Sequence, residues 1–153
     1  MREVEKRKEI YCMFIGHSFY PYADLRKKIE EIVENLIVNE GVNCFLDGWH
    51  GDFDILCRDI CYDLKKKYPY IKILKCLTHY SHIVPDLCAP DEDYDSTLWF
   101  DLGTVYPKAI ITERNKQMVD CSHFIVCGIR KNYGGAYKTY RYAKKQNKTL
   151  IEL

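Results

Sequence analysis

Short apolar runs alternate with amphipathic segments along most of this chain of 153 residues. Residues 11–15 form a continuous apolar run of the kind that a strand covered on both faces of a sheet shows. With their flanks they belong to the first of five predicted strands, which span residues 9–15, 42–46, 71–77, 124–127 and 149–152. Between them, apolar residues recur at the spacing of a helix face, as in residues 25–36, 55–64 and 137–146. Alternating strands and helices predict right-handed crossovers and a mainly parallel sheet with helices on both faces. We therefore expect one α/β domain spanning residues 1–153.

Two glycine-rich turns each lead from a predicted strand into a predicted helix. They are residues 48–54, Gly-Trp-His-Gly-Asp-Phe-Asp, and residues 132–136, Asn-Tyr-Gly-Gly-Ala. Such a turn exposes unpaired backbone N–H groups beside the positive end of a helix dipole, where phosphates bind. Both turns, like Gly16 and His17 after the first strand, follow the carboxyl end of a strand, where open parallel sheets bind their ligands. The sequence therefore predicts a nucleotide site at this edge of the sheet.

The segment of residues 78–106 interrupts the alternation. It contains two prolines, an acidic cluster at residues 91–93 and the aromatic residues Tyr94, Trp99 and Phe100, with no sustained period. We expect an irregular insertion. Two interpretations are open: a surface loop whose aromatic side chains fill the core, or a segment that covers a ligand.

Charge and hydropathy exclude several classes of partner. The 23 Lys and Arg residues nearly balance the 22 Asp and Glu residues, so no global field attracts nucleic acid, and we do not expect a nucleic-acid partner. Residues 2–9 are almost all charged, and no apolar run approaches the ~20 residues that a membrane span needs. We expect a cytoplasmic protein without a membrane partner.

The eight cysteines are expected to pack in the core rather than to bind metal. None has C-x-x-C spacing, and most fall within apolar runs, where a free thiol behaves as a small hydrophobic group. The alternative is a zinc site that combines Cys57 and Cys61 with His50, His79 or His82, although this spacing matches no structural zinc motif. We predict no metal, no cofactor and no disulfide framework.

A series of short motifs extends over nearly the whole chain. In order they are Gly16-His17, Gly48-x-x-Gly51-x-Phe53-Asp54, Leu64-Lys65-x-x-Tyr68-Pro69, Arg114-Asn115-x-x-Met118-Val119-Asp120 and Gly134-Gly135-Ala136 with Thr139. In this order they resemble the YpsA-like branch of the SLOG superfamily, which unites the cytokinin-activating LOG enzymes with DNA-processing DprA-type proteins. The resemblance implies a Rossmann-like fold, a nucleotide or nucleotide-derived ligand at the strand ends, and a homodimer or higher homo-oligomer.

The chain departs from the LOG pattern at one catalytic position. LOG enzymes hydrolyse the N-glycosidic bond of a nucleoside 5′-monophosphate with an arginine from an Arg-Lys motif and a glutamate after a P-G-G-x-G-T turn. Arg114 matches that arginine, and Asn115 replaces the lysine. Lys138 or Thr139 stands where the glutamate would be, and residues 134–146 contain no Glu or Asp. We therefore do not expect LOG-type catalysis, which needs a carboxylate, whereas phosphate binding does not.

The candidate ligand-binding residues come from the strand ends and the predicted helix that carries Arg114. They are Gly16, His17, Gly48, Trp49, His50, Gly51, Asp54, Arg114, Asn115, Gly134, Gly135, Ala136 and Thr139. Arg114 is the strongest of them, because its guanidinium can bind phosphate in bidentate fashion. The alternative for Arg114 is an ion pair on a helix surface.

Four other candidates have alternative interpretations. His17 either contacts a ligand or is satisfied by backbone groups, and Trp49 either stacks on a base or narrows the pocket. Asp54 either caps the helix or acts as a first-turn acid, or it contacts the ligand directly. Asp52 and Asp54 are also the remaining candidates for catalysis.

Three functions follow from these observations. The first is a protein that binds a nucleotide or nucleotide-derived signal without turning it over, as a sensor or, if a phage encodes it, as a sponge that sequesters a defence signal. The second is a LOG-like N-glycosidic hydrolase with a rearranged acid and base. The third is a DprA-like DNA-processing protein. The missing glutamate favours the first over the second, and the near-neutral charge disfavours the third.

Overall fold

The computed structural model describes residues 8–48, 51–77, 94–100, 102 and 109–153. Its strands and helices follow the predicted alternation, and each predicted run lies in the expected type of element. They are β1 (Tyr11–Gly16), α1 (Arg26–Asn39), β2 (Cys44–Asp47), α2 (Asp52–Lys67), β3 (Lys72–Leu77), β4 (Ser96–Trp99), α3 (Ile110–Cys121), β5 (Phe124–Gly128), α4 (Gly135–Lys145) and β6 (Thr149–Glu152), with a short 3₁₀ turn, η1 (Ala23–Leu25), before α1.

The strands form one sheet of six in the order β4-β3-β2-β1-β5-β6. Every pair of neighbouring strands is parallel, so the prediction of an α/β domain with a mainly parallel sheet is confirmed. Successive strands advance from β1 to β4 on one side of β1, whereas β5 and β6 lie on its other side. This reversal makes the gap between β1 and β5 the topological switch point, where such sheets bind ligands.

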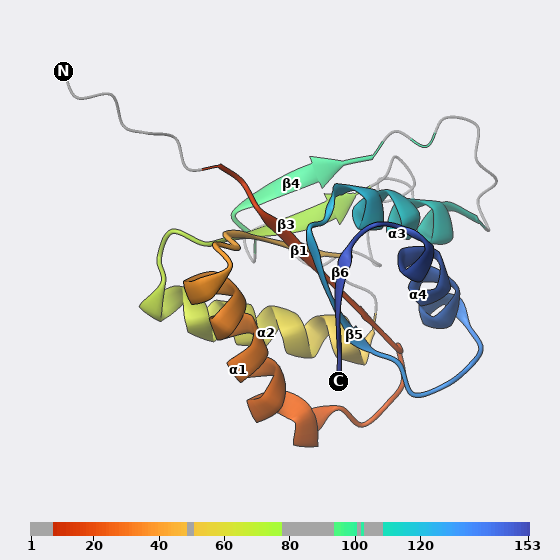
Figure 1. Ribbon diagram of the computed structural model, residues 1–153, viewed down its shortest axis with the longest axis horizontal. Helices are drawn as coiled ribbons and strands as arrows, with labels where there is room; N and C mark the ends of the chain where they lie inside the picture. The colour runs from red at the N-terminus through yellow and green to blue at the C-terminus, as the bar shows by residue number, and fades with distance from the viewer. Residues whose placement is uncertain (1–7, 49–50, 78–93, 101, 103–108) are drawn as a thin grey trace.

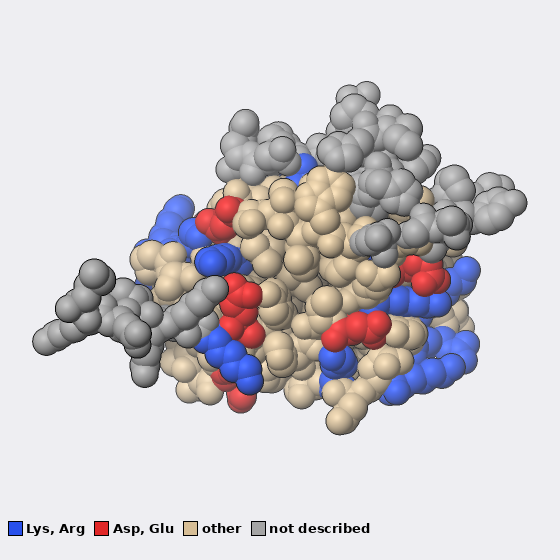
Figure 2. Space-filling model, turned by 90° about the horizontal axis from the view of Figure 1, so that it is seen from above, with Lys and Arg blue, Asp and Glu red and all other residues tan. Residues whose placement is uncertain are grey.

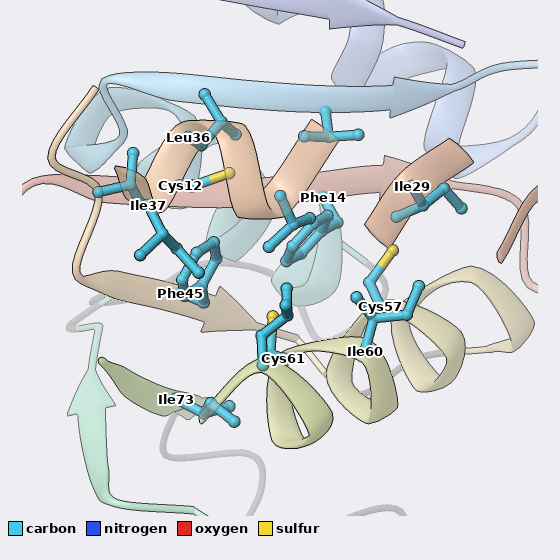
Figure 3. Packing of buried hydrophobic residues seen from close by; sticks show 14 of the residues in the cluster. Cys12, Phe14, Ile29, Leu36, Ile37, Phe45, Cys57, Ile60, Cys61 and Ile73 are labelled. Carbon is cyan, nitrogen blue, oxygen red and sulfur yellow. The ribbon is translucent and has the colours of Figure 1, made fainter. Parts of the chain in front are cut away.

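Helices cover both faces of the sheet, α1 and α2 on one face and α3 and α4 on the other (Figure 1). Alternate residues along a strand pack into two separate hydrophobic cores, one on each face of the sheet, because successive side chains point to opposite faces. In β1, Cys12 and Phe14 pack against α1 and α2, while Met13 and Ile15 pack against α3 and α4. Figure 3 shows the first core, in which Phe14 lies among residues of both helices. The double cover explains why the strands read as continuous apolar runs.

Local signals in the sequence set the ends of the helices. After α1, Gly41 adopts a positive φ of 73°, and the Val42 N–H donates to the Leu36 carbonyl, which reverses the chain towards β2. The helix α2 ends at Lys67 because Pro69 disfavours helical geometry at the residue before it, and Tyr68 has a ψ of 77°.

The prediction that residues 78–106 form an irregular insertion without regular structure is wrong at its carboxyl end, where β4 extends the sheet beside β3. The strand escaped detection because it lies at the edge and is mostly exposed, so it has no apolar pattern. Phe100 is buried in the core, and the Tyr94 hydroxyl donates to the Asp47 carboxylate over 2.6 Å. These contacts favour the core-filling interpretation for both residues; residues 78–93 lie outside the described part of the chain.

Of the seven cysteines among the described residues, six are buried, as predicted; the prediction is wrong for Cys121, which is exposed at the end of α3, and Cys88 lies outside the described residues. Burial raises the pKa of the Cys44 thiol to about 11 and that of Cys127 to about 12, so both remain neutral thiols near pH 7. Cys57 and Cys61 point into the core under α2 (Figure 3), and the three histidines of the alternative zinc site lie outside the described residues. Within the described ranges, no group of three or more metal-binding side chains occurs. None of the described helices is long and apolar enough to cross a membrane.

Candidate functional site

A cavity of about 370 Å³ lies at the switch point, at the carboxyl ends of β1, β2 and β5. The neighbouring strands β1 and β5 both end in glycine, and Gly16 and Gly128 face each other in register. Phe53 of α2 packs against both glycines, since a Cβ atom would lie 2.1 Å from its ring at Gly16 and 2.8 Å at Gly128. This close approach holds the first turn of α2 at the strand ends and makes it part of the cavity wall.

The structure brings most of the predicted residues together around this cavity. Those that line it are Gly16, His17, Gly48, Asp54, Arg114, Asn115, Gly134, Gly135, Ala136 and Thr139. Gly51 and Asp52 do not belong to the lining, and Trp49 and His50 lie outside the described residues. Contact between these residues and a ligand stays a prediction.

Arg114 is the most unusual side chain in the lining. It is only 5% exposed, although it carries a permanent charge. One guanidinium nitrogen donates to Asn115 Oδ1 over 3.2 Å, and Nε is buried without a hydrogen-bond partner among the described residues. Burying a charged donor without a partner is unfavourable, so a well-packed arginine of this kind is expected to have an anionic partner.

The first glycine turn is tightly packed against the rest of the protein. A Cβ atom on Gly48 would lie 2.6 Å from Arg114 Nη2 and 3.6 Å from Asp54 Oδ2, so the missing side chain makes room for the guanidinium. Gly51 has a φ of 102°, and a Cβ atom there would lie 2.2 Å from Ser18 Cα. The Asp52 N–H donates to the Ser18 carbonyl over 2.8 Å, which fastens the turn to the loop after β1.

Asp52 is a structural residue of this turn. It is exposed, and its carboxylate accepts a hydrogen bond from the Tyr20 N–H over 3.2 Å. The N-cap position of α2 is occupied by Gly51, so neither Asp52 nor Asp54 caps the helix, and both are first-turn acids. Carboxylates in the first turn interact favourably with the helix dipole.

The second glycine turn is open. Gly134 is the N-cap of α4 and has a φ of 91°, a geometry that favours glycine. A Cβ atom on Gly134 or Gly135 would meet nothing within 4 Å among the described residues. The first turn of α4 contains no acidic residue, and its N-cap makes no side-chain hydrogen bond. Gly134, Gly135 and Ala136 line the cavity, so the positive end of the α4 dipole lies at the cavity wall.

His17 ties together two of the loops around the cavity. Its Nε2 accepts hydrogen bonds from the backbone N–H groups of Arg130 and Lys131 over 2.9 and 3.0 Å. The backbone N–H of His17 donates to the Tyr22 hydroxyl, and that hydroxyl donates to the Gly128 carbonyl. Because Nε2 is an acceptor, the proton of the neutral ring is on Nδ1. Burial, followed by the charges of Lys131 and Arg130, lowers the pKa of His17 below its usual value.

His17 thus matches the interpretation in which backbone groups satisfy a loop histidine, although it also lines the cavity. Of the two residues at the position of the LOG glutamate, Thr139 lines the cavity and Lys138 is exposed. The Thr139 hydroxyl donates to the Gly135 carbonyl over 3.1 Å and is no carboxylate. Asp54 supplies the acidic group among the described lining residues.

Sequence reasoning missed several residues of the lining. Phe19, Ile111, Lys131 and Tyr133 are among these, and none was a candidate ligand-binding residue. Their positions carried one signal: Phe19 and Lys131 lie within three residues of a strand end, and Tyr133 lies within the second glycine turn.

Although the net charge of the chain is close to zero, one segment of it is strongly basic. Between residues 130 and 148 there is no acidic residue, and the segment contains Arg130, Lys131, Lys138, Arg141, Lys144, Lys145 and Lys148. Figure 2 shows Lys and Arg side chains gathered along the right-hand edge, on the side where α4 lies in Figure 1. Averaging over the whole sequence cancels this local excess against acidic residues elsewhere.

Several solved structures resemble this fold. DNA processing protein A (DprA) from Streptococcus pneumoniae gives a TM-score of 0.66 at 12% identity, covering 94% of this chain and 50% of that one. DprA from Helicobacter pylori, whose structure is described as giving insight into single-stranded DNA binding, gives 0.61 at 13% identity, covering 94% and 64%. The protein TM1055 gives 0.59 at 13% identity, covering 92% and 72%.

These similarities show the Rossmann-like α/β fold that the motifs implied. Membership of the SLOG superfamily and of its YpsA-like branch stays a prediction. The chain spans only about half to three quarters of the length of these proteins. A search of family models and of curated proteins finds no match. Since DprA of Helicobacter pylori binds single-stranded DNA, the expectation that nucleic acid is excluded as a partner has no support from the comparisons.

Proposed function

We propose that this protein binds a nucleotide or nucleotide-derived compound in the cavity at the switch point and does not turn it over. In this role it serves as a sensor or sequesters a signal. The observation that carries the proposal is Arg114, a buried guanidinium whose Nε lacks a protein partner within the described chain. A phosphate would satisfy it through paired charge-assisted hydrogen bonds.

The second glycine turn supplies the complementary half of such a site. Gly134 and Gly135 line the same cavity as Arg114, and no described atom occupies the space where their side chains would be. Backbone N–H groups at the start of α4 can therefore approach a phosphate closely. A guanidinium and a helix N-terminus that share one cavity favour an anion over a neutral ligand.

Binding without hydrolysis is favoured by the residue at the position of the LOG glutamate. Thr139 stands there, and its hydroxyl is engaged with the Gly135 carbonyl. A threonine cannot act as the carboxylate that stabilises an oxocarbenium-like transition state or activates water. The bound ligand is therefore expected to remain intact.

Mass spectrometry of compounds released from the denatured protein tests the proposal. The protein is first incubated with nucleoside monophosphates, dinucleotides, cyclic nucleotides and ADP-ribose derivatives, and one intact compound is expected at near-stoichiometric yield. Arg114→Ala should weaken its binding about 10- to 100-fold, because hydrogen bonds to charged groups contribute about 1.5–3 kcal/mol. Arg26→Ala, which removes a surface ion pair with Asp63, is the matched control and should bind normally. Unchanged affinity in Arg114→Ala would exclude Arg114 from the site.

A hydrolase is the second candidate, and Asp54 is the observation that favours it. Asp54 lines the cavity in the first turn of α2, and its Oδ2 lies 3.6 Å from the position that a Cβ atom on Gly48 would take. A carboxylate in this position could serve as general base or stabilise positive charge on a sugar. Accumulation of free base and ribose phosphate, and its loss in Asp54→Asn, would establish this function in place of simple binding.

A DNA-binding protein is the third candidate, and the basic segment of residues 130–148, which includes α4, favours it. Seven basic residues without an acidic one lie between residues 130 and 148, and the DprA structures share the fold. Binding through such a segment releases counterions and weakens steeply with salt. Fluorescence anisotropy of a labelled single strand at about 50 and about 200 mM salt would test it. A double charge reversal, Lys144→Glu with Lys145→Glu, should remove the signal if the DNA binds there.

We also propose the homodimer that the family resemblance implies. Multi-angle light scattering at several protein concentrations should give twice the chain mass of 18.2 kDa. A monomer at every concentration would refute it.

A further inference from the structure

We propose that Phe19 and Tyr133 form an aromatic rim that holds the base of the bound nucleotide by stacking. The inference rests on the proposed function, because it assigns the base end of a ligand whose phosphate binds at Arg114 and the α4 turn. It identifies the ligand class as a phosphate compound that carries an aromatic base.

The exposure of the two rings is the first observation. Phe19 is 84% exposed and Tyr133 is 66% exposed, the two largest values among the large hydrophobic residues that the structure describes. Both line the cavity, whereas the exposed Tyr70 and Trp99 do not. Exposed aromatic side chains at the edge of a cavity are typical of surfaces that take up an apolar ligand group.

The backbone that carries the rings is held in place. Phe19 lies in the loop after β1 and Tyr133 in the loop after β5, and His17 Nε2 joins these loops by accepting from Arg130 and Lys131. The Lys131 ammonium also donates to the Phe19 carbonyl over 3.3 Å. Rings on fixed loops lose little conformational entropy on binding, since only two side-chain torsions must be ordered.

The dimensions of the cavity fit a nucleotide. Its volume of about 370 Å³ lies within the range of roughly 300–1,000 Å³ that is typical of small-molecule pockets. Arg114 is buried and the rim residues are exposed, so the two groups mark an inner and an outer end of one cavity. A nucleotide also has two ends, a phosphate and a base, separated by the sugar. With the phosphate at the inner end, the base reaches the outer end.

The test compares ligands with and without a base. Nucleoside 5′-monophosphates of the four common bases and ribose 5-phosphate are titrated by calorimetry into the wild type, Phe19→Ala, Tyr133→Ala and the double variant. Each alanine substitution should weaken nucleotide binding about 5- to 150-fold, the range for loss of one base–aromatic stack. Ribose 5-phosphate should bind all four proteins equally, and more weakly than the nucleotides bind the wild type.

Conservative variants separate stacking from other roles of the ring. Tyr133→Phe keeps the ring and should bind nucleotides like the wild type, whereas Phe19→Leu keeps an apolar side chain without a ring and should bind like Phe19→Ala. The control Tyr70→Ala removes an exposed aromatic residue outside the cavity and should change nothing.

Three results would overturn the inference. If the wild type binds ribose 5-phosphate as tightly as every nucleotide, phosphate recognition stands and base stacking fails. If the rim variants change the oligomeric state in light scattering and leave nucleotide affinity unchanged, the rings form an interface between copies of the chain. If the wild type binds no phosphate compound while Arg114→Ala behaves identically, the proposed function fails together with the inference.

Discussion

The two glycine turns look alike in the sequence and differ in the structure. In the first turn, the packing of the protein leaves no room for a side chain at either glycine. A Cβ atom on Gly48 would clash with Arg114, and one on Gly51 would clash with Ser18. In the second turn, a Cβ atom on Gly134 or Gly135 meets no described atom within 4 Å. Only the φ of 91° at Gly134 gives an internal reason for glycine there.

The difference separates packing from binding. A glycine whose side-chain space is filled by the protein serves folding or positions a neighbour, as Gly48 does for Arg114. A glycine whose side-chain space is empty, as at Gly135, leaves its backbone accessible from outside. The first turn therefore builds the cavity wall, and the second turn is the better candidate for direct contact with phosphate.

The largest expected effect is on stability, in Gly51→Ala. The new side chain would lie 2.2 Å from Ser18 Cα, at a φ of 102° that alanine rarely adopts. Strain and overpacking together should lower the free energy of unfolding by about 2–5 kcal/mol. Urea unfolding followed by circular dichroism measures the change. Gly135→Ala is the matched control, with a change of about 1 kcal/mol or less; equal losses in both variants would remove the distinction between the turns.

A smaller effect, on binding rather than stability, is expected for Gly48→Ala. Its Cβ atom would lie 2.6 Å from Arg114 Nη2, the mobile end of a long side chain, so the guanidinium can move aside. Nucleotide affinity should fall about tenfold because one charge-assisted hydrogen bond is misplaced. Gly48→Val should lose more, through the same displacement of Arg114. Calorimetric titration beside urea unfolding checks both; full affinity in Gly48→Val would show that the position of Arg114 is irrelevant.

Gly135→Val sharpens the comparison from the other turn. The side chain enters space that no described atom occupies, so the stability should remain within about 1 kcal/mol of the wild type. Phosphate affinity should nevertheless fall several-fold, roughly as one neutral hydrogen bond is lost. Inorganic phosphate and a nucleoside monophosphate are titrated in parallel. Asn147→Val, an exposed and uncharged position just beyond α4, is the control; equal affinity in both variants would mean that no ligand approaches Gly135.

The sequence predicted the sheet and the place of the site because both depend on local patterns. Apolar runs without a polar face gave β1 and β5, and a parallel sheet brings every strand end to one edge. It failed for β4, whose residues are mostly exposed and acquire their strand geometry by pairing with β3. A strand whose geometry depends only on pairing with its neighbour has no apolar pattern of its own, so the sequence pattern cannot predict it.

The cavity lining was predicted at the level of residues mainly where a motif marked it. Arg114 and Gly135 were predicted in this way, whereas Phe19 and Tyr133 were missed because a place near a strand end or in a glycine turn does not by itself show that a side chain lies beside a cavity. The opposite properties of the two glycine turns were equally hidden, because they depend on Arg114 and Ser18, which come from other parts of the chain.

The smallest expected effect concerns His17, which joins the loop packed on the first turn to the loop that leads into the second. Burial and the nearby Lys131 and Arg130 charges lower its pKa in the folded protein below the value near 6.5 of an unfolded chain. The unfolded chain therefore binds more protons as the pH falls below about 6.5, and stability that is present above this pH is lost. The protonated ring could no longer accept at Nε2 from Arg130 and Lys131. Unfolding free energies at several pH values measure the loss, about 1 kcal/mol for one hydrogen bond. In His17→Gln an amide oxygen accepts without titrating, so the loss should shrink; an identical pH profile in both proteins would show that His17 does not couple the two turns to pH.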